Sequence, residues 1–174
     1  MKIISDKILL RKPEPDDLEA LYSLKNDEES SALLGGFSTG FYKEAISDWI
    51  KFHNKAANEV LYMIQDIESE KLIGHVGFYN INYRVRKAEF AILIADKNFR
   101  GKGYGDLCTK YMINYGFNQL NLNRIELSVL TTNINAIVLY EKNGFVKEGV
   151  QKQAQFKNGS YIDVILMANL RENL

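Results

Sequence analysis

The run Arg100-Gly101-Lys102-Gly103-Tyr104-Gly105 carries the clearest chemical signal in this chain. Its three glycines at alternate positions let the backbone approach a ligand closely and expose N–H groups to it. The run follows an apolar stretch at residues 89–95 and precedes a helix-like segment at residues 106–118. A helix that begins there adds unpaired N–H groups and a partial positive charge. A strand, a basic glycine-rich turn and a helix together predict a phosphate-binding site.

Two common phosphate motifs do not fit this run. A P-loop needs Ser or Thr after Gly-Lys so that a hydroxyl reaches Mg²⁺, whereas Gly103 follows Lys102 here. A dinucleotide fingerprint needs G-x-G-x-x-G, but its last glycine falls on Cys108 or on Asp106, depending on the starting glycine. The pattern that fits is Arg-x-x-Gly-x-Gly. Alone, this pattern leaves open an ordinary turn before a helix, or an unrelated nucleotide-binding protein.

A second motif begins 28 residues after Gly105 and reads Asn133-x-x-Ala136-x-x-x-Tyr140-Glu141-x-x-Gly144-Phe145. Together the two motifs resemble those of the GCN5-related N-acetyltransferases (the GNAT family), which bind acetyl-CoA. The two ends of the chain look like the RimJ/RimL branch of that family. The matching residues there are Leu10, Arg11 and Asp16 at the head, and Gly159, Tyr161, Asp163 and Met167 at the tail. Ala88-Glu89-Phe90 and Tyr115-Gly116-Phe117 are similar to segments of spermidine acetyltransferases.

The resemblance covers nearly the whole chain and implies an acyl-CoA N-acyltransferase fold. It also implies that the glycine-rich loop holds the pyrophosphate of acetyl-CoA, mainly through main-chain N–H groups, and that the preceding strand offers main-chain groups to pantetheine. The cofactor-binding residues it implies are Ile92, Leu93, Ile94, Arg100, Gly101, Lys102, Gly103, Tyr104, Gly105, Asp106, Asn133 and Tyr140. Asn133 also suits a simple helix N-cap.

The implied reaction is attack of a neutral amine on a thioester. It needs a group that takes a proton from the amine, and it benefits from a donor to the departing thiolate. The resemblance places Tyr140 beside the CoA sulfur, and a phenol with an ordinary pKa near 10 is protonated at neutral pH. Tyr140 is therefore the candidate proton donor, against the alternative of a core tyrosine. Glu89 is the candidate general base or amine anchor, although an acid paired with Arg86 or Lys87 fits its position equally well.

The remaining reactive side chains are expected to be structural. His75 lies within a strand pattern, His53 on an amphipathic helix, and Cys108 just inside the helix after the loop. Two substrates bound side by side need no covalent enzyme intermediate, so no nucleophilic cysteine is expected. No His, Cys, Asp or Glu cluster has the spacing of metal ligands, and no metal is expected.

The acceptor amine is less well determined. The branch that this chain resembles uses polyamines, aminoglycosides, amino sugars or protein N-termini, and its acceptor pockets would correspond to residues 27–42 and 151–161. The acids Asp27-Glu28-Glu29 and the local resemblance favour a small polyamine such as spermidine. Gly35-Gly36 departs from the acidic and aromatic residues expected there. An amino sugar or aminoglycoside, a protein N-terminal amine, and a non-catalytic acyl-CoA-binding module remain open.

The composition sets the broad class. The chain has 174 residues, and 22 basic side chains balance 22 acidic ones, so neither nucleic acid nor a membrane is an expected partner. A single cysteine excludes an internal disulfide framework and fits a reducing compartment. We therefore expect a cytoplasmic protein in which residues 1–174 form a single N-acetyltransferase domain. The closing strands could pair across a dimer, so a homo-oligomer is compatible with the sequence.

The elements that must position these residues indicate a mixed α/β fold, with a mostly antiparallel central sheet and flanking helices. Strands are expected at residues 8–11, 60–67, 72–81, 90–95, 124–130, 146–156 and 161–170. Helices are expected after Pro15, over residues 44–55 and 106–118, and from Asn133 to Gly144. The helix over 106–118 should pack through Leu107, Tyr111, Met112 and Tyr115. The crossover through that helix should join two parallel strands.

Overall fold

The computed structural model describes residues 2–34 and 40–171. Its centre is an eight-stranded sheet in the order β1-β2-β3-β4-β5-β6-β8-β7. The strands are β1 (Lys2–Ile3), β2 (Ile8–Arg11), β3 (Val60–Asp66), β4 (Leu72–Asn82), β5 (Lys87–Ile94), β6 (Arg124–Leu130), β7 (Val146–Lys157) and β8 (Ser160–Leu170). The helices are η1 (Pro15–Asp17), α1 (Leu18–Lys25), α2 (Glu28–Leu33), α3 (Lys43–Lys55), η2 (Lys97–Phe99), α4 (Tyr104–Asn118) and α5 (Ile134–Lys142).

All neighbouring strands in the sheet are antiparallel except β5 and β6. The parallel pair is joined by α4, as the crossover rule requires. The expected hairpins β3–β4 and β7–β8 are both present. The mixed α/β fold with a mostly antiparallel sheet, predicted from the sequence, is confirmed.

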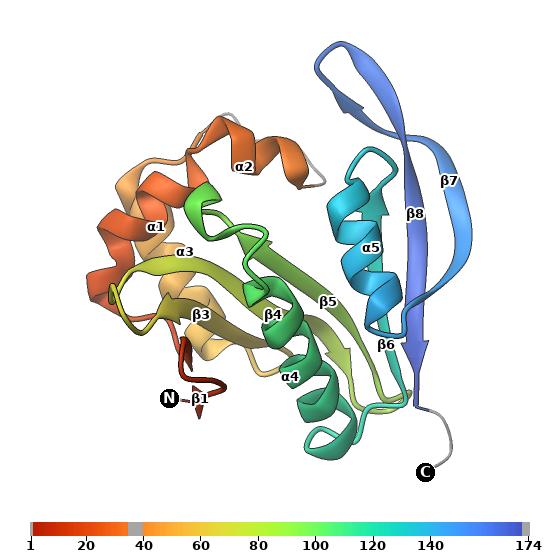
Figure 1. Ribbon diagram of the computed structural model, residues 1–174, viewed down its shortest axis with the longest axis horizontal. Coiled ribbons are helices and arrows are strands. Elements are labelled where there is room, and N and C mark those ends of the chain that lie inside the picture. The colour runs from red at the N-terminus through yellow and green to blue at the C-terminus, as the bar shows by residue number, and fades with distance from the viewer. Residues whose placement is uncertain (1, 35–39, 172–174) are drawn as a thin grey trace.

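Helices cover both faces of the sheet, with α4 and α5 on one face and α1 and α3 on the other (Figure 1). The larger core lies under α4 and α5, where Phe78, Phe90 and Ile125 meet Met112 and Tyr140. The smaller core lies under α1 and α3 and is built on Leu21, Ile46, Ile50, Leu61 and Met63. Because side chains alternate along a strand, β3 and β4 supply residues to both cores.

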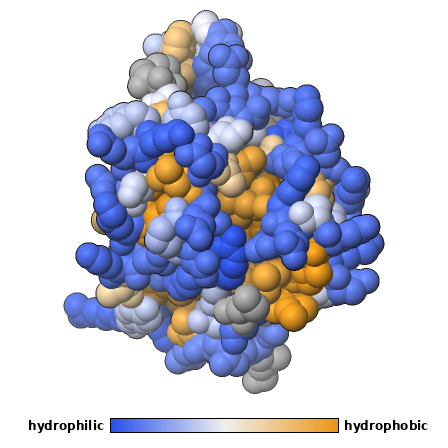
Figure 2. Space-filling model, turned by 90° about the vertical axis from the view of Figure 1, so that its left-hand side faces the viewer, coloured by the Kyte–Doolittle hydropathy of each residue, from blue (hydrophilic) through white to orange (hydrophobic). Residues whose placement is uncertain are grey.

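The side of the molecule where α1 and α3 lie carries mainly hydrophilic side chains, with hydrophobic residues gathered in patches between them (Figure 2). Within the described ranges, none of the helices is both long and apolar enough to cross a membrane.

The structure corrects the predicted packing of α4. Leu107 is 39% exposed, whereas the buried residues of this helix are Tyr104, Cys108, Thr109, Met112 and Gly116. The helix also starts at Tyr104, two residues before the predicted start, because Gly103 takes a left-handed conformation and serves as its N-cap. Small residues allow the helix to sit close to the sheet, since a Cβ on Gly116 would lie 2.8 Å from the Phe78 ring. Of the four predicted packing residues only Leu107 is wrong, because Met112 is buried and Tyr111 and Tyr115 pack against the larger core.

Three short elements are absent from the prediction, the strand β1 and the helices α2 and η2. Asp27 caps α2 by accepting a hydrogen bond from the Ser30 N–H. None of the three has enough residues to show a hydrophobic period. The glycine-rich sequence of residues 35–40 predicts a loop, and residues 35–39 of it lie outside the described residues.

Candidate active site

The centre of the sheet opens where β5 and β6 part. The two strands pair only from Lys87–Arg124 to Glu89–Glu126, although β5 continues to Ile94 and β6 to Leu130. Beyond Glu89, β5 stays paired with β4 on its other side. The edge of β5 that faces β6 therefore has no strand partner over residues 92–94, and its main-chain groups are open there apart from the Ile94 carbonyl oxygen, which accepts from Arg100. Such groups can bind an extended ligand as a further strand would.

The glycine-rich loop lies between β5 and α4. Gly101 and Gly103 have φ angles of +72° and +87°, which other L-residues rarely adopt. A Cβ on either glycine would meet no atom within 4 Å, so the space above both is open. With a helix N-terminus behind them, these residues form an accessible cradle of N–H groups for an anion.

The Arg100 side chain is occupied by protein contacts. Its Nε donates to the Ile94 carbonyl oxygen at 2.9 Å, and its two terminal nitrogens donate to Glu29, Ser30 and the Ala95 carbonyl oxygen at 2.7–2.9 Å. Arg100 thus joins α2 to the end of β5. Its charge lies near the loop, but its donors already have partners.

The side chains of three other residues of the predicted loop site also contact the protein and not the open space above the loop. Tyr104 is buried and donates a 2.7 Å hydrogen bond to Asp66, so only its main chain is available at the loop. Asp106 accepts hydrogen bonds from Lys110, Lys142 and Asn143 and so links α4 to α5. Lys102 extends over the Phe99 ring, with its Nζ 5.4 Å from the ring centre.

Helix α5 brings Asn133 and Tyr140 to the open region. The Asn133 side chain accepts a 3.2 Å hydrogen bond from the Ala136 N–H and caps the helix. The Tyr140 ring is 7% exposed and packs edge-on against Phe90 and Phe145, at 6.2 and 5.7 Å between ring centres. Burial raises the pKa of Tyr140 to about 12. The phenol therefore remains protonated at neutral pH and can donate a proton.

The Tyr140 hydroxyl has no hydrogen-bond partner among residues 2–34 and 40–171. In the same part of the chain, the only fully enclosed side-chain polar atoms without a partner are His75 Nδ1 and Thr109 Oγ1. The Tyr140 hydroxyl is therefore unpaired but accessible at its tip.

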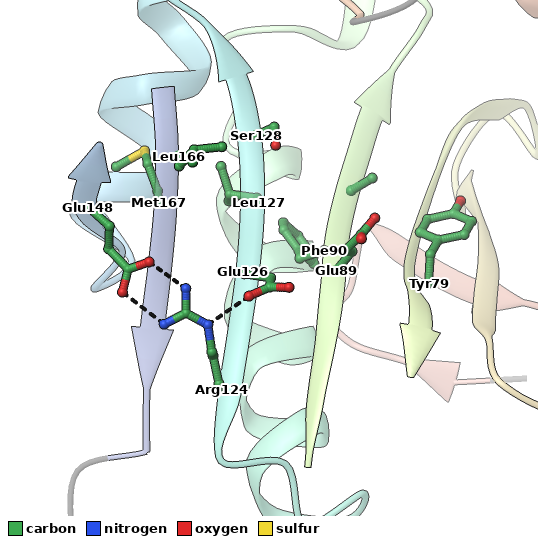
Figure 3. Close-up of a pocket in the computed structure, with 11 residues that line it drawn as sticks. Tyr79, Glu89, Phe90, Arg124, Glu126, Leu127, Ser128, Glu148, Leu166 and Met167 are labelled. Carbon is green, nitrogen blue, oxygen red and sulfur yellow. Dashed lines mark hydrogen bonds and ion pairs between the residues drawn. The ribbon is translucent and has the colours of Figure 1, made fainter. Parts of the chain in front are cut away.

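A pocket of about 380 Å³ lies beside the parting strands (Figure 3). Its lining comes from β4, β5, β6, β7 and β8 and comprises Tyr79, Glu89, Phe90, Ala91, Arg124, Glu126, Leu127, Ser128, Glu148, Leu166 and Met167. Glu89, the predicted base or anchor, is exposed within it. Glu89 makes no ion pair with any described residue, because Lys87 pairs with Glu126 instead, at 2.6 Å.

The other two carboxylates of the pocket are neutralised. Arg124 donates to Glu126 at 2.7 Å and forms a bidentate pair with Glu148, as Figure 3 shows. Burial raises the pKa of Glu126, but hydrogen bonds from Arg124 and Lys87 outweigh it and leave this pKa below its usual value. These ion pairs keep both carboxylates ionised, and the positive charges of Arg124 and Lys87 balance them. Glu89 therefore carries the uncompensated negative charge of the pocket.

Glu89 and Tyr140 reach the opening from opposite faces of the sheet. Glu89 stands opposite Tyr79 in the β4–β5 register, on the face covered by α1 and α3. Phe90, the next residue, points to the other face and touches Tyr140. The two candidate catalytic groups thus belong to opposite faces of the sheet, and Glu89 is the last residue of β5 paired with β6.

The remaining reactive side chains lie elsewhere or are enclosed. Cys108 is fully buried, and burial raises its pKa to about 12, so it is an unreactive thiol. His75 lies beside the Trp49 ring, and burial lowers its pKa to about 3. In the described ranges, no group of three or more His, Cys, Asp and Glu residues could hold a metal ion.

Comparison with known proteins shows the family to which this chain belongs. A family model described as "Acetyltransferase (GNAT) domain" matches residues 7–146. This chain belongs to the GNAT family of acetyltransferases. The predicted family and the predicted enzyme class, an acetyl-CoA-dependent N-acetyltransferase, are thereby confirmed.

The similar proteins cover almost the full length of this GNAT enzyme. It is 33% identical to spermidine N(1)-acetyltransferase of Vibrio cholerae serotype O1 over 164 residues, which are 92% of this chain and 91% of that protein. The spermidine N(1)-acetyltransferase of Escherichia coli strain K12 is 32% identical over 161 residues, 92% of this chain and 84% of that protein. A crystal structure of the Vibrio cholerae enzyme in complex with CoA and spermine superposes with a TM-score of 0.88 at 32% identity, over 96% of this chain and 97% of that one.

The site of this GNAT enzyme fits acetyl-CoA. The open cradle at Gly101 and Gly103 suits a pyrophosphate, and the free edge of β5 suits an extended amide-containing arm. Two groups that line or support the pocket were missed from the sequence, Tyr79 and Arg124. Tyr79 stands opposite Glu89 and Arg124 pairs with Glu148 only through the folding of the sheet, so no local motif marks them.

Proposed function

We propose that this enzyme acetylates a primary amine of a small polyamine, such as spermidine, with acetyl-CoA as donor. The observation that carries the proposal is the unpaired Glu89 carboxylate in a pocket beside the parting strands. A cation is attracted to an uncompensated carboxylate in a partly enclosed site more strongly than to one in open water. The similarity to two spermidine acetyltransferases supports the same acceptor class.

The proposed roles of the protein groups follow from their positions. The main chain of residues 101–105 holds the pyrophosphate, and the free edge of β5 aligns the pantetheine arm along the opening. The acceptor enters from the pocket and places its amine near Glu89. Glu89 binds the ammonium form and receives its proton, directly or through water.

The proposed reaction is a direct transfer. The neutral amine nitrogen attacks the thioester carbonyl carbon, the new C–N bond forms, and the C–S bond breaks. Tyr140 gives its proton to the departing sulfur, and the excess proton of the amine leaves through Glu89. Tyr140 then recovers a proton from solvent, so charge and atoms balance at the end of each turnover.

The experiment that tests this function is thiol release from acetyl-CoA with a panel of amines. The panel contains spermidine, spermine, aminoglycosides, amino sugars and short peptides with free N-termini. We expect release with the polyamines at a kcat/KM at least tenfold above that of the other classes. Preferential release with a sugar amine or a peptide would reject the polyamine assignment. If no amine of the panel causes thiol release, none of the tested classes is the acceptor.

The contribution of Glu89 is tested in the same assay. Glu89→Gln keeps the shape of the side chain but removes its charge and its capacity to take a proton. We expect kcat/KM for the polyamine to fall on the order of 100-fold, with the KM for acetyl-CoA unchanged. Glu141→Gln on α5, away from the pocket lining, serves as the charge-matched control.

A further inference from the structure

The Tyr79 side chain is another unpaired polar group on the same face of the pocket as Glu89. The two residues stand directly opposite each other in the antiparallel β4–β5 register, so their side chains are close neighbours on one face. In Figure 3 Glu89 lies between Tyr79 and the Arg124 network. Within residues 2–34 and 40–171, the Tyr79 hydroxyl has no hydrogen-bond partner, and it is not among the enclosed atoms. It is therefore available to a ligand in the pocket.

The Tyr79 ring is held in place from behind. Its centre lies 5.9 Å from the His53 ring in an edge-on contact. His53 is fixed in turn by a 2.5 Å hydrogen bond between its Nδ1 and Glu59, and by the Trp49 ring at 4.3 Å. These contacts come from α3 and the start of β3, which are rigid parts of the smaller core. The hydroxyl is thus presented to the pocket from a preorganised support, as a recognition group requires.

The electrostatic surroundings keep this hydroxyl neutral. Burial and the nearby Glu59 carboxylate raise the pKa of Tyr79 above its ordinary value. A neutral phenol can accept a hydrogen bond from an ammonium group while it donates to a carboxylate. Glu89 supplies the carboxylate, and the acceptor would supply the ammonium.

We propose that Tyr79 is a specificity-determining residue that binds the reacting amine of the acceptor together with Glu89. This inference rests on the proposed function, because it concerns the same pocket. The amine is held between the Tyr79 hydroxyl on β4 and the Glu89 carboxylate on β5. The Arg124 network fills the other wall and leaves this corner as the place for a cation.

The test is a double-mutant cycle between Tyr79→Phe and Glu89→Gln. Tyr79→Phe removes only the hydroxyl and retains the ring that contacts His53. Initial rates are measured against spermidine at saturating acetyl-CoA, and against acetyl-CoA at saturating spermidine. We expect Tyr79→Phe to raise the KM for the amine about tenfold, as the loss of a hydrogen bond to a charged group would, with the KM for acetyl-CoA unchanged. In the double variant the loss should be smaller than the product of the two single losses, because both groups hold one amine.

Tyr111→Phe is the matched control. It removes a tyrosine hydroxyl from α4, on the opposite face of the sheet, and both KM values should stay within twofold of wild type. A Tyr79→Phe enzyme with an unchanged KM for the amine would overturn the inference. Independent, multiplying effects in the cycle would overturn it as well, since the two groups would then contact different parts of the acceptor.

Failure of this inference can be told apart from failure of the proposed function. If the panel selects another amine class, the polyamine assignment fails, and the cycle is repeated with the amine that is turned over. A coupled loss with that amine still supports a shared anchor at Tyr79 and Glu89. A preserved melting temperature for Tyr79→Phe shows that a loss in rate comes from the site and not from unfolding.

Discussion

Tyr140 combines burial with an unpaired, accessible hydroxyl. The surrounding Phe90 and Phe145 rings exclude water from its ring and raise its pKa to about 12. None of the described residues forms a hydrogen bond with the Tyr140 hydroxyl. The arrangement suits a proton donor to a leaving thiolate.

Tyr140→Phe tests that role. We expect kcat to fall on the order of 100-fold, because general-acid catalysis contributes at least that much, while the Kd for CoA changes less than twofold. The wild-type rate should not decline between pH 8 and pH 10 through this group, because the phenol is protonated below its raised pKa. Calorimetric titration with CoA measures the Kd, and a pH profile of kcat measures the dependence of the rate on pH. An unchanged kcat with acetyl transfer rate-limiting would contradict the assignment.

At the scale of elements, the main chain of the loop before α4 and the side chain of Arg100 within it play different roles. The loop offers main-chain groups in left-handed conformations, and Arg100 joins α2 to β5. A side chain at Gly103 costs about 1–2 kcal/mol from its positive φ alone. A side chain there would also stand in the open space above the loop.

We therefore expect Gly103→Ala to raise the Kd for CoA on the order of tenfold, and Arg100→Lys to raise it less than threefold while lowering the melting temperature. Gly159→Ala is the matched control for strain, because Gly159 also has a positive φ and open space around it, but lies in the β7–β8 turn. Equal effects of Gly103→Ala and Gly159→Ala on CoA binding would show that strain alone is responsible.

Asp106 connects the two helices that border the donor side. It accepts from Lys110 on its own helix and from Lys142 and Asn143 at the end of α5. The hydrogen bond from Lys110, followed by those from Asn143 and Lys142, outweighs burial and holds the pKa of Asp106 well below its usual value. A carboxyl whose pKa is lowered in the folded state adds stability above its unfolded pKa, and this stability is lost as the pH falls through the folded pKa.

Asp106→Asn should therefore lower the free energy of unfolding by about 1 kcal/mol at pH 7, since the two lysines are largely exposed and the amide partner is partly buried. Urea unfolding at pH 7 measures this difference. The difference should shrink as the pH falls below about 4, the ordinary pKa of an aspartate. Asp48→Asn removes an exposed pair with Lys51 and should change stability little. A constant difference down to pH 2 would contradict the account.

At the scale of the whole molecule, the proposed donor group Tyr140 and the proposed acceptor anchor Glu89 belong to opposite faces of one sheet, beside the place where β5 and β6 part. Both substrates can then be bound at once, and the described residues place no reactive thiol at this opening, since Cys108 is enclosed. Transfer should be direct.

Initial-rate kinetics should accordingly show intersecting double-reciprocal lines for acetyl-CoA and the amine. Mass spectrometry after incubation with acetyl-CoA alone should show no acetylated enzyme. Parallel lines together with an acetylated protein would instead indicate a covalent intermediate.

The sequence predicted most of this architecture, for identifiable reasons. The strands and long helices have clear periods, and the caps at Asn133 and Gly144 are local signals. The predicted contact of Leu107 was wrong and the small buried residues of α4 were missed, because part of its buried face uses glycine, threonine and cysteine. The pairing of Arg124 with Glu148, and the position of Tyr79 beside Glu89, depend on strand register. Strand register becomes visible only when distant segments are placed together.

The contacts of α2 have a consequence for the order in which the nascent chain can fold. This helix leaves the ribosome well before the residues that anchor it. Arg100 bonds Glu29 and Ser30 across about 70 positions, and Lys157 donates to the Ser31 carbonyl oxygen from 126 positions away. During synthesis this helix is therefore anchored in two stages, first by Arg100 and later by Lys157.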